Sequence, residues 1–504
     1  MSGDLEAAGR VGRFNRLKEH FPFALFRAGQ SPPSGRHILY VLPADVSSFR
    51  VRLRGMRVLL VRGPCLPPSP YRLDELLAMP PLSLILLSGM LRVHGAEVAI
   101  RDLCLSRRKW RDAGSDPCAR PVSAVEWKNH LIGRPSPRLR SLLGWLTGEL
   151  KLGKAGMVAF SVESQDDLRL GLSLSRELAG RVPVVIGGRE VRLDDPLIAA
   201  CPEARIIAGE GEAPLLLYAD ALGGGRALSE VPGLNWTEGG LRRSQSSVIH
   251  DLDVWPAFDL AGVPLRDYRS DILAEGSGPL VPYQFNRGCP FLCGFCNSFS
   301  RREFRLRSPA KVVADLRDAV RQGVRRFYFV NHLLNGSPSH LRELVERLEA
   351  ARLGIFWGDC CRTAGLDEAM LRRLRSVGAS QLVWGVDCAS PALARRMKKS
   401  SDPVRAPAIL AAAHRAGIRN VVNLIIGMPR ETERDVEETL RFIRRVRPFV
   451  DSFNVSPYGF DRNCPLARDP GAYGLRPGTP EPLPVPDPER TARSLARVEA
   501  AARG

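Results

Sequence analysis

The chain has 504 residues, of which 44% are hydrophobic and 7% aromatic, so it is long and apolar enough to form two or three globular domains. No apolar run approaches the roughly 18 residues that span a bilayer, which argues against an integral membrane protein. The first 30 residues also lack a signal-type apolar core, and we expect a cytoplasmic location. The net charge of +19 is spread along the chain without an aromatic-interleaved basic patch, which favours a solvated basic surface over a nucleic-acid partner.

The first regular pattern begins at Arg57. Residues 1–55 show no clear period, and their structure is left unassigned. The strand RVLLV, the helical pattern PPLSLILLSGMLRVHG and the strand EVAIRDL then form a strand–helix–strand unit. The segment 106–154 is basic and broken by Pro and Gly, so we expect an irregular insertion with one helix at about 139–150.

The alternation of strands and helices resumes after this insertion. The strands are MVAFSV, VPVVIGG and RIIAGEGE, with amphipathic helices expected at about 168–178 and 214–222. Strands that are apolar throughout indicate a parallel sheet covered on both faces, so residues 56–225 are predicted to be a doubly wound, Rossmann-like α/β domain. Ligands of such sheets bind beyond the carboxyl ends of the strands, and the residues there are Ser161, Val162, Gly187, Gly188, Gly209, Glu210 and Gly211.

A second alternation follows a linker that we place at 226–275. Its six strands are expected at 281–286, 326–331, 355–362, 381–387, 420–427 and 452–458. Successive strand–helix units predict a partial (β/α)6 barrel of the TIM type over residues 276–475, with its chemistry at the carboxyl ends of the strands. Residues 476–504 are Pro-rich and are expected to be a poorly ordered tail with a short helix.

Three cysteines directly follow the first strand of this predicted barrel. The chain has eleven cysteines, an odd number without a secretory signal, which favours metal or catalytic use over disulfides. In NRGCPFLCGFCNS, Cys289, Cys293 and Cys296 lie on one loop. Three such thiolates can bind three irons of a four-iron, four-sulfur (4Fe-4S) cluster and leave the fourth iron open to S-adenosylmethionine (SAM).

Two other interpretations of these cysteines are open. A zinc site would need a fourth ligand, which Cys360 or Cys361 could supply from a later strand. Alternatively, the three thiols are unconnected buried cysteines, but their density after a strand of this type argues against it. The spacing at the mouth of a barrel favours the cluster.

With these motifs in place, the chain resembles the cobalamin-dependent radical SAM enzymes from about Arg57 to Leu475. In the barrel the resemblance depends on the segments RGCPFLCGFC, FYFVNHLLNG, WGDCCR, LVWGVDCAS, RRMKKS, AHRAGIRNVVNLIIGMPRET and SPYGFDRNCPLARDPGAYGL. In the first domain it depends on MPPLSLILLSGMLRVHGAEVAIRDL, VAFSV, VVIGG and GEGEAPLL. The combination is specific to the family, although no single segment is.

The resemblance implies roles for individual residues. Cys289, Cys293 and Cys296 match the family's cluster ligands, and the SAM-binding positions match Phe295, Arg362, Asp387, Ile426, Gly427 and Met428. Asp387 stands where the family usually has a Glu that contacts the ribose, in a Glu-Ser-Gly motif that here reads Asp-Cys-Ala. The alternative role for Asp387 is that of an ordinary helix cap, since it opens DCASPALARR.

The first domain is similar to the cobalamin-binding domain of the same family. It contains no Asp-x-His-x-x-Gly motif, and its histidines, His94 and His130, lack that context. The resemblance therefore implies cobalamin without an axial histidine, bound by the small residues at the strand ends. The competing interpretation is that their glycines only serve tight strand-to-helix turns.

The resemblance favours a methyltransferase that acts on an unactivated carbon through a 5'-deoxyadenosyl radical and methylcobalamin. The alternatives are a cyclase or rearrangement enzyme with the same cofactors, a non-catalytic cobalamin-binding regulator, and an RNA-modifying radical enzyme. The expected partners are a small-molecule, lipid or peptide substrate and an electron donor such as flavodoxin or ferredoxin. Cys360 and Cys361 lie on alternate faces of one strand, so only one can point into the barrel as a catalytic thiol.

Overall fold

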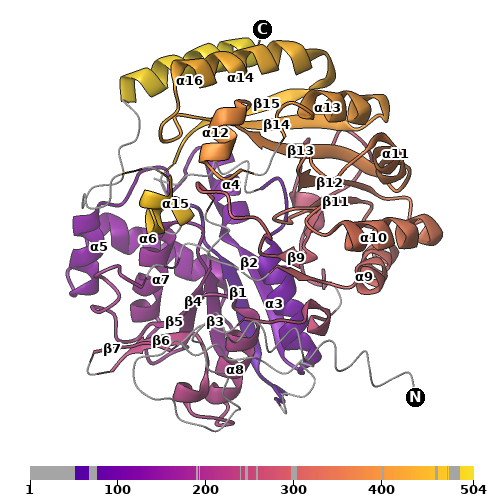
Figure 1. Cartoon of the computed structure of the whole chain (residues 1–504). Helices are drawn as coiled ribbons and strands as arrows, with labels where there is room; N and C mark the ends of the chain where they lie inside the picture. Colours follow the sequence, from indigo (N-terminus) through magenta and orange to yellow (C-terminus); the bar gives the residue numbers. More distant parts are fainter. Residues whose placement is uncertain are drawn as a thin grey trace, which may run out of the picture. The chain divides into compact units, whose positions relative to one another are not determined.

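The computed structural model shows an α/β chain with two large, mainly parallel sheets, as the sequence predicts (Figure 1). It describes residues 51–66, 77–188, 191, 193–238, 240–244, 248–256, 259–296, 304–399, 402–459, 464–473, 475 and 488–503. Most of the N-terminal segment 1–55, and residues 476–487 of the tail, lie outside this part of the chain. The described residues divide into two compact units, of which the first holds 83–250 and 254–262 with the initial strand, and the second holds most of the rest.

The first unit is built on a sheet with the strand order β2-β1-β3-β4-β5-β6-β7. Strands β1 (Arg57–Arg62), β2 (Glu97–Asp102), β3 (Met157–Ser161), β4 (Val184–Gly187) and β5 (Arg205–Ile207) are parallel. Every residue of β3 is buried, which explains its uninterrupted apolar sequence. The predicted doubly wound fold is confirmed.

Helices cover this sheet on both sides. Helix α3 (Leu82–Val93) lies on one side, and α7 (Gln165–Glu177) packs on the other with the predicted insertion (Figure 1). The insertion is more regular than expected, since it forms α4 (Leu103–Asp112), α5 (Ala124–Leu131) and α6 (Pro137–Leu150). Helices α5 and α6 begin at serine caps, Ser123 and Ser136, whose hydroxyls satisfy free amide groups of the first turn. Helix α6 is the helix expected at about 139–150, whereas α4 and α5 were not expected.

Part of the segment expected to be a linker, 226–275, instead extends the first sheet. Strands β6 (Leu234–Thr237) and β7 (Leu241–Arg242) pair antiparallel to β5 and to each other, after helix α8 (Glu212–Leu222). The first unit therefore continues beyond residue 225.

The second unit contains six parallel strands in the order β15-β14-β13-β12-β11-β8. Their bounds are β8 (Leu280–Tyr283), β11 (Arg326–Phe329), β12 (Phe356–Cys361), β13 (Ala379–Asp387), β14 (Arg419–Ile426) and β15 (Ser452–Pro457). No pairing among the described residues joins β15 to β8, so this is the open, partial barrel that the sequence predicts. A short antiparallel pair, β9 (Asn286–Arg287) and β10 (Arg305–Leu306), follows β8.

Helices line the outside of this sheet (Figure 1). They are α9 (Pro309–Arg321), α10 (Pro338–Ala351), α11 (Glu368–Ser376), α12 (Pro391–Arg396), α13 (Ala406–Arg415) and α14 (Glu433–Val446). In α10 the buried residues Leu341, Leu344, Val345 and Leu348 recur at helical spacing. Burying each such side chain stabilises the fold by about 1.5–3 kcal/mol.

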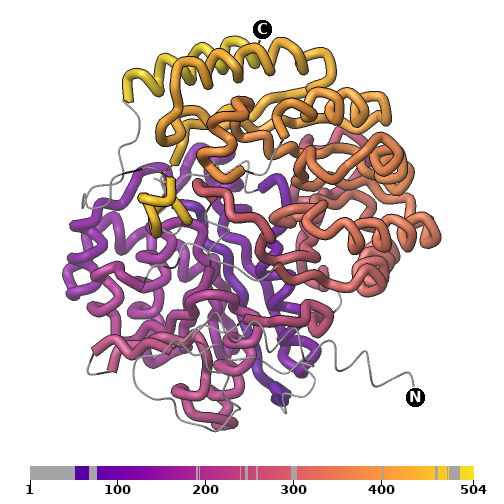
Figure 2. Tube along the Cα trace, viewed as in Figure 1, coloured from indigo at the N-terminus to yellow at the C-terminus, as the bar shows by residue number. Residues whose placement is uncertain are grey.

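The end of the chain is more ordered than we expected. After the short α15 (Pro465–Arg468), helix α16 (Pro488–Arg503) packs against α14, and the tube in Figure 2 shows the two helices side by side. The guanidinium of Arg447 donates hydrogen bonds of 2.9–3.0 Å to the last carbonyls of α16. These carbonyls have no partner within the helix, so Arg447 caps it.

Candidate functional site

The cysteine loop begins where β9 ends, at the carboxyl edge of the barrel strands. Cys293 is buried, whereas Cys289 and Cys296 are partly exposed. Gly288 has a φ of +76°, a conformation that glycine adopts without strain, and it turns the chain into the loop. Burial raises the pKa of the Cys289 and Cys293 thiols, and the positive charges of Arg362 and Lys399 oppose this shift.

The base of the loop is held by buried amide side chains. Asn331 Oδ1 accepts hydrogen bonds from the amides of Phe285 (3.1 Å) and Asn286 (3.0 Å). Asn331 Nδ2 donates to Asp359 on β12 at 2.7 Å. Asn286 in turn accepts from the His332 amide at 3.0 Å. Asp359 is fully buried, which raises the pKa of its carboxyl group well above the usual value. This network fixes the start of the loop to the ends of β11 and β12.

The outer part of the loop is fixed at Gly294. Its amide donates to the Met397 carbonyl at 2.7 Å, and its carbonyl accepts from the Leu466 amide at 3.0 Å. A Cβ atom at this position would collide with the Tyr473 ring. Segments about 100 and 170 residues farther along the chain thus clamp the loop, and position 294 must be glycine for Tyr473 to pack there.

Two buried cations accompany the thiols. The Arg362 guanidinium lies 3.8 Å from the centre of the Phe291 ring, and the Lys399 ammonium lies 5.9 Å from that of Phe295. Both side chains are at least nine-tenths buried. A cluster with three thiolates is anionic, and SAM carries a carboxylate, so this donor set and its charges suit both groups. Arg362 was predicted from the resemblance, whereas Lys399 was not, although it lies in the segment RRMKKS that carries the resemblance.

Asp387 pairs with Lys399 through a buried ion pair. Burial alone would lower the pKa of the Lys399 ammonium, but the carboxylate of Asp387 and the nearby Cys293 raise it overall. Asp387 has a φ of +61° and follows an irregularity in the pairing of β13 with β14. The cap of helix α12 is Ser390, whose hydroxyl accepts from the Leu393 amide at 3.3 Å. The role of an ordinary helix cap therefore belongs to Ser390 and not to Asp387.

The end of β14 presents the third predicted SAM contact, formed by Ile426, Gly427 and Met428. The Gly427 amide donates to the Glu431 carboxylate at 2.8 Å. Gly427 has a φ of +83°, and a Cβ atom there would lie 2.5 Å from Thr491 of α16. Burial raises the pKa of Glu431 to about 7. Thr491 was not predicted, because no sequence pattern near position 491 indicates a contact with residue 427.

Cys360 and Cys361 do point to opposite faces of β12. Cys361 is fully buried, whereas Cys360 is partly exposed and interacts with Tyr328. Burial raises the pKa of Cys360 to about 12 and that of Cys361 well above its usual value, so both are protonated thiols at neutral pH. Within the described ranges, no three His, Cys, Asp or Glu side chains converge closely enough to hold one metal ion, and the structure does not bring Cys360 or Cys361 into such a group.

In the first unit the predicted ligand positions lie at the carboxyl ends of β3, β4 and β5. The strand order reverses direction between β1 and β3, which is where such sheets bind ligands. The Val162 amide donates to the Gly187 carbonyl at 2.9 Å, and the Gly63 amide to the Ser161 carbonyl at 3.1 Å. The end of β1, where Gly63 lies, was not among the predicted ligand positions.

The glycines at these strand ends differ in their packing. A Cβ atom at Gly188 would lie 2.5 Å from the Val162 carbonyl oxygen, so backbone packing alone requires glycine there. Gly209 has a φ of +100° and serves a turn. A Cβ atom at Gly211 would meet nothing, and one at Gly187 would make only ordinary contacts of 3.7 Å or more. Gly211 thus leaves open space at this edge, and packing requires no glycine at either position, which the turn interpretation does not explain.

Glu210 and the two histidines of the first unit occupy different surroundings. Glu210 accepts a hydrogen bond of 3.3 Å from the Ile249 amide. His94 Nδ1 lies 2.9 Å from the Met90 carbonyl oxygen, and His130 is buried in α5. Asp167 is fully buried, which raises the pKa of its carboxyl group to about 7. Neither histidine lies at a strand end.

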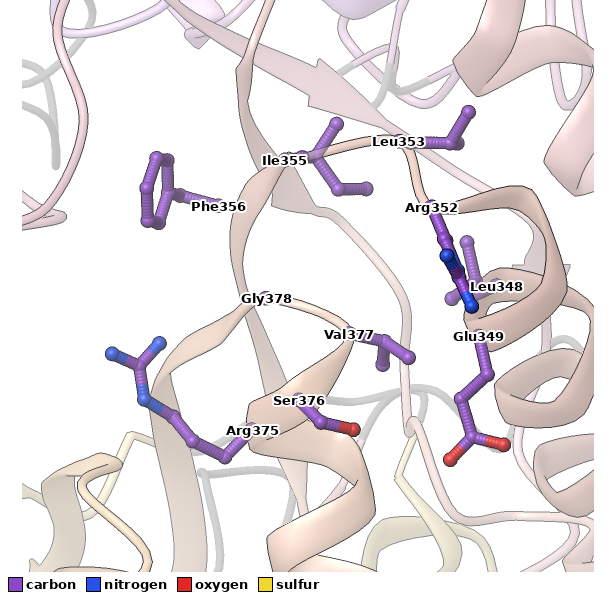
Figure 3. Close-up of a pocket in the computed structure, with 11 residues that line it drawn as sticks. Leu348, Glu349, Arg352, Leu353, Ile355, Phe356, Arg375, Ser376, Val377 and Gly378 are labelled. Carbon is purple, nitrogen blue, oxygen red and sulfur yellow. The ribbon is translucent and has the colours of Figure 1, made fainter.

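A pocket of about 500 Å³ lies elsewhere in the second unit (Figure 3). It is lined by Ile355 and Phe356 at the start of β12, by Gly378 before β13, and by the ends of α10 and α11. The close-up shows Arg352 and Arg375 on separate sides of it. These are the amino ends of the strands, opposite to the cysteine loop, so the pocket is not part of the candidate site.

Comparison with known proteins gives a family for the second unit. Residues 283–443 match the model of the radical SAM superfamily. The chain is 26% identical over 296 residues to an uncharacterized methyltransferase of Pyrococcus horikoshii, covering 56% of this chain and 63% of that protein. It is also 26% identical over 298 residues to the anaerobic magnesium-protoporphyrin IX monomethyl ester cyclase of Rubrivivax gelatinosus, covering 55% and 51%. The chain thus spans less than two thirds of the length of these relatives.

Solved structures extend the likeness to both units. The radical SAM methyltransferase TsrM of Kitasatospora setae, determined with cobalamin and a 4Fe-4S cluster, has a TM-score of 0.58 at 19% identity, over 88% of this chain and 81% of that one. The cobalamin-dependent SAM radical enzyme OxsB has a TM-score of 0.57 at 18% identity, over 78% and 52%. No helix in the described part of the chain is long and apolar enough to cross a membrane. Residues 283–443 thus match a radical SAM domain, and the chain has the fold of the cobalamin-dependent radical SAM enzymes TsrM and OxsB.

Proposed function

We propose that this protein is a cobalamin-dependent radical SAM methyltransferase that methylates an unactivated carbon. The observation that carries the proposal is the clamped loop of Cys289, Cys293 and Cys296, with Arg362 and Lys399 buried beside it. In such enzymes the cluster supplies the electron that cleaves SAM, and cobalamin supplies the methyl group. The residues of this chain bind and orient these groups.

Each SAM-binding residue has a chemical reason for its role. The ammonium of Lys399 and the guanidinium of Arg362 would attract the carboxylate of SAM. Asp387 has one oxygen on Lys399, which leaves the other to accept hydrogen bonds from the ribose hydroxyls. The backbone at Gly427 and Met428 would meet the adenine, and Phe295 would pack near the cluster. Replacing Asp387 by alanine should weaken SAM binding while iron content stays unchanged.

We propose that cobalamin binds at the carboxyl ends of β3, β4 and β5. The open space at Gly211 fits a group that approaches the backbone closely, and the position matches the ligand site of doubly wound sheets. Ser161 and Val162 would contact it from β3, and Gly188, Gly209 and Glu210 from the neighbouring turns. Neither His94 nor His130 lies where it could bind cobalt, so we propose cobalamin without an axial histidine.

The test is anaerobic turnover with the reconstituted protein. Methyl transfer through a substrate radical gives both 5'-deoxyadenosine and S-adenosylhomocysteine, because one SAM supplies the radical and another the methyl group. The first product alone would support the second candidate, a cyclase or rearrangement enzyme, which the relative from Rubrivivax gelatinosus favours. Failure to cleave SAM at all would contradict both. The substrate class that we propose is a small molecule, lipid or peptide.

A further inference from the structure

Two asparagines on the inner face of the partial barrel form a hydrogen-bonded pair near the expected SAM site. We propose that this pair, Asn423 and Asn454, binds an uncharged amide group of the substrate. The amide belongs either to a peptide or to a small molecule. The inference rests on the proposed function, because it assumes that SAM binds at Asp387 and Lys399.

The two asparagines lie on the face of the sheet that points away from the helices. On β14, Asn423 is partly exposed, whereas both of its neighbours in the strand are fully buried. Asn420 points to the outer face, where its side chain donates to the Leu410 carbonyl of α13 at 2.9 Å. Side chains alternate along a strand, so Asn423, three residues later, points to the inner face. Asn454 of β15 pairs in register with Asn423 and shares this face.

The strand register also places the pair beside the expected SAM site. Gly385 of β13 pairs with Asn423, so the two positions are neighbours on one face, about 5 Å apart. A Cβ atom at Gly385 would lie 3.4 Å from the Lys399 ammonium and 3.7 Å from a carboxylate oxygen of Asp387. Asn454 lies one strand farther away. A substrate bound by the two asparagines would therefore lie next to the carboxylate that we expect to bind the ribose.

The paired side chains leave one donor and one acceptor for a ligand. Asn454 Nδ2 donates to Asn423 Oδ1 at 3.0 Å. Within the described part of the chain, neither side chain makes a second hydrogen bond, so Asn423 Nδ2 and Asn454 Oδ1 remain available. β15 is the end strand of the sheet, and Asn454 on it is exposed (Figure 1). A ligand can therefore reach both groups.

An amide complements this donor and acceptor. Its carbonyl oxygen accepts from Asn423 Nδ2, and its N–H donates to Asn454 Oδ1. An extended peptide presents the N–H and C=O of one residue on the same side, and a lactam presents both on one edge. A carboxylate has only acceptors and would leave Asn454 Oδ1 facing another oxygen, while an acyl chain offers no partner to either group. The pair therefore favours a peptide or an amide-bearing small molecule over a lipid.

The rest of this face also suits an uncharged ligand. The strand register puts Cys360 on the same face, and Tyr328 contacts it. Both are partly exposed and uncharged at neutral pH, and Ser456 on β15 is exposed and uncharged. The cation at the start of β14, Arg419, lies 3.7 Å from the Asp451 carboxylate, which offsets its charge.

The test is the binding of matched probes to the iron-reconstituted, oxidised protein without SAM, followed by saturation-transfer NMR titration. The probes are 2-piperidone, N-methyl-2-piperidone, N-acetylalanine methylamide and hexanoate. N-methylation removes the N–H of the lactam and keeps its carbonyl. Hexanoate represents an acyl chain with a carboxylate.

The variants remove the amide pair in two ways. Asn423→Asp keeps the acceptor for Asn454 Nδ2 and nearly the same volume, but it replaces the available donor with a charged acceptor. Asn423→Leu combined with Asn454→Leu removes both amides together, so neither is left without its partner. Gln322→Glu is the control, because it makes the same change from amide to carboxylate at an exposed position at the end of α9.

We expect the wild-type protein to bind 2-piperidone or N-acetylalanine methylamide in the millimolar range that is typical of ligands of this size. N-methylation of the lactam, Asn423→Asp and the double leucine variant should each weaken this binding about tenfold or more. Gln322→Glu should bind like the wild type, and all variants should take up the same iron. Tighter binding of the peptide probe would indicate a peptide substrate, and tighter binding of the lactam a small molecule.

Four results would overturn the inference. They are no binding of either amide probe to the wild type, equal affinity for the lactam and its N-methyl derivative, unchanged affinity in the asparagine variants, and tighter binding of hexanoate than of both amide probes. A protein that binds the amide probes through the pair but does not cleave SAM would keep this inference and reject the proposed function. A protein that cleaves SAM but whose asparagine variants bind the probes normally would do the reverse.

Discussion

Replacing Glu431 by glutamine should stabilise the second unit at alkaline pH and leave it nearly unchanged at acidic pH. Glu431 is 7% exposed, and burial raises the pKa of its carboxyl group from 4.5 to about 7. An acid whose pKa is higher in the folded state binds more protons there than in the unfolded state. The contribution of Glu431 to the free energy of unfolding is therefore present below pH 4.5 and is lost as the pH rises through 7.

The magnitude follows from the two pKa values. Their difference corresponds to about 3 kcal/mol of stability that the wild-type protein loses between acidic and alkaline pH. Glutamine keeps an oxygen for the Gly427 amide but carries no charge to desolvate. The variant should therefore gain about 3 kcal/mol over wild type at pH 8 and less than about 1 kcal/mol at pH 5.

The assay is thermal unfolding of the iron-free protein at these two pH values. For a unit of this size, about 3 kcal/mol raises the melting temperature by about 6–12 °C. Glu433→Gln in the first turn of α14, two residues after Glu431, is the control, because hydrogen bonding from Arg497 lowers the pKa of Glu433 and the substitution should destabilise slightly. A variant of Glu431 that is no more stable than wild type at pH 8 would refute the assigned burial of its charge.

Other substitutions test the loop and its neighbours. In Gly294→Ala the new Cβ atom should collide with the Tyr473 ring and lower the iron content of the reconstituted protein. Adding Tyr473→Leu to the same chain should restore part of the iron. Normal iron content in the single variant would contradict the proposed contact between Tyr473 and the loop. Lys399→Met leaves the buried charge of Asp387 without its partner, so it should lower the free energy of unfolding by about 3–5 kcal/mol. Adding Asp387→Asn to the same chain removes that charge and should reduce the loss. Arg430→Gly should raise the melting temperature slightly, because the φ of +61° at Arg430 strains a residue with a Cβ atom by about 1 kcal/mol. A lower melting temperature would mean that the Arg430 side chain makes a compensating contact.

Strands with uninterrupted apolar runs give the clearest signal in the sequence. β3 and β13 could be found because nearly every residue in them is buried. β6 and β7 were missed because they are short and partly exposed, so neither an apolar run nor a strict alternation marks them. The helices α4 and α5 were missed because prolines and basic residues surround them.

The residues of the candidate site also fall into those that the sequence alone predicts and those that it does not. The three cysteines could be identified from local spacing alone, since one loop carries them all. Lys399, Tyr473 and Thr491 could not, because their roles depend on contacts with residues 12 to 180 positions away in the chain. Asp387 was identified by resemblance, but its buried ion pair and the cap at Ser390 became visible only in three dimensions. Tertiary packing, which no local pattern encodes, completes the site.

The cysteine loop can be tested most directly by its metal content and its reaction with SAM. We expect the anaerobically reconstituted protein to bind about four irons and four sulfides per chain and, once reduced with dithionite, to show an electron paramagnetic resonance signal that changes when SAM is added. Replacing Cys289, Cys293 and Cys296 by alanine should abolish both the iron and the signal. A wild-type protein that binds zinc in preference to iron, or a cluster whose signal ignores SAM, would contradict the account.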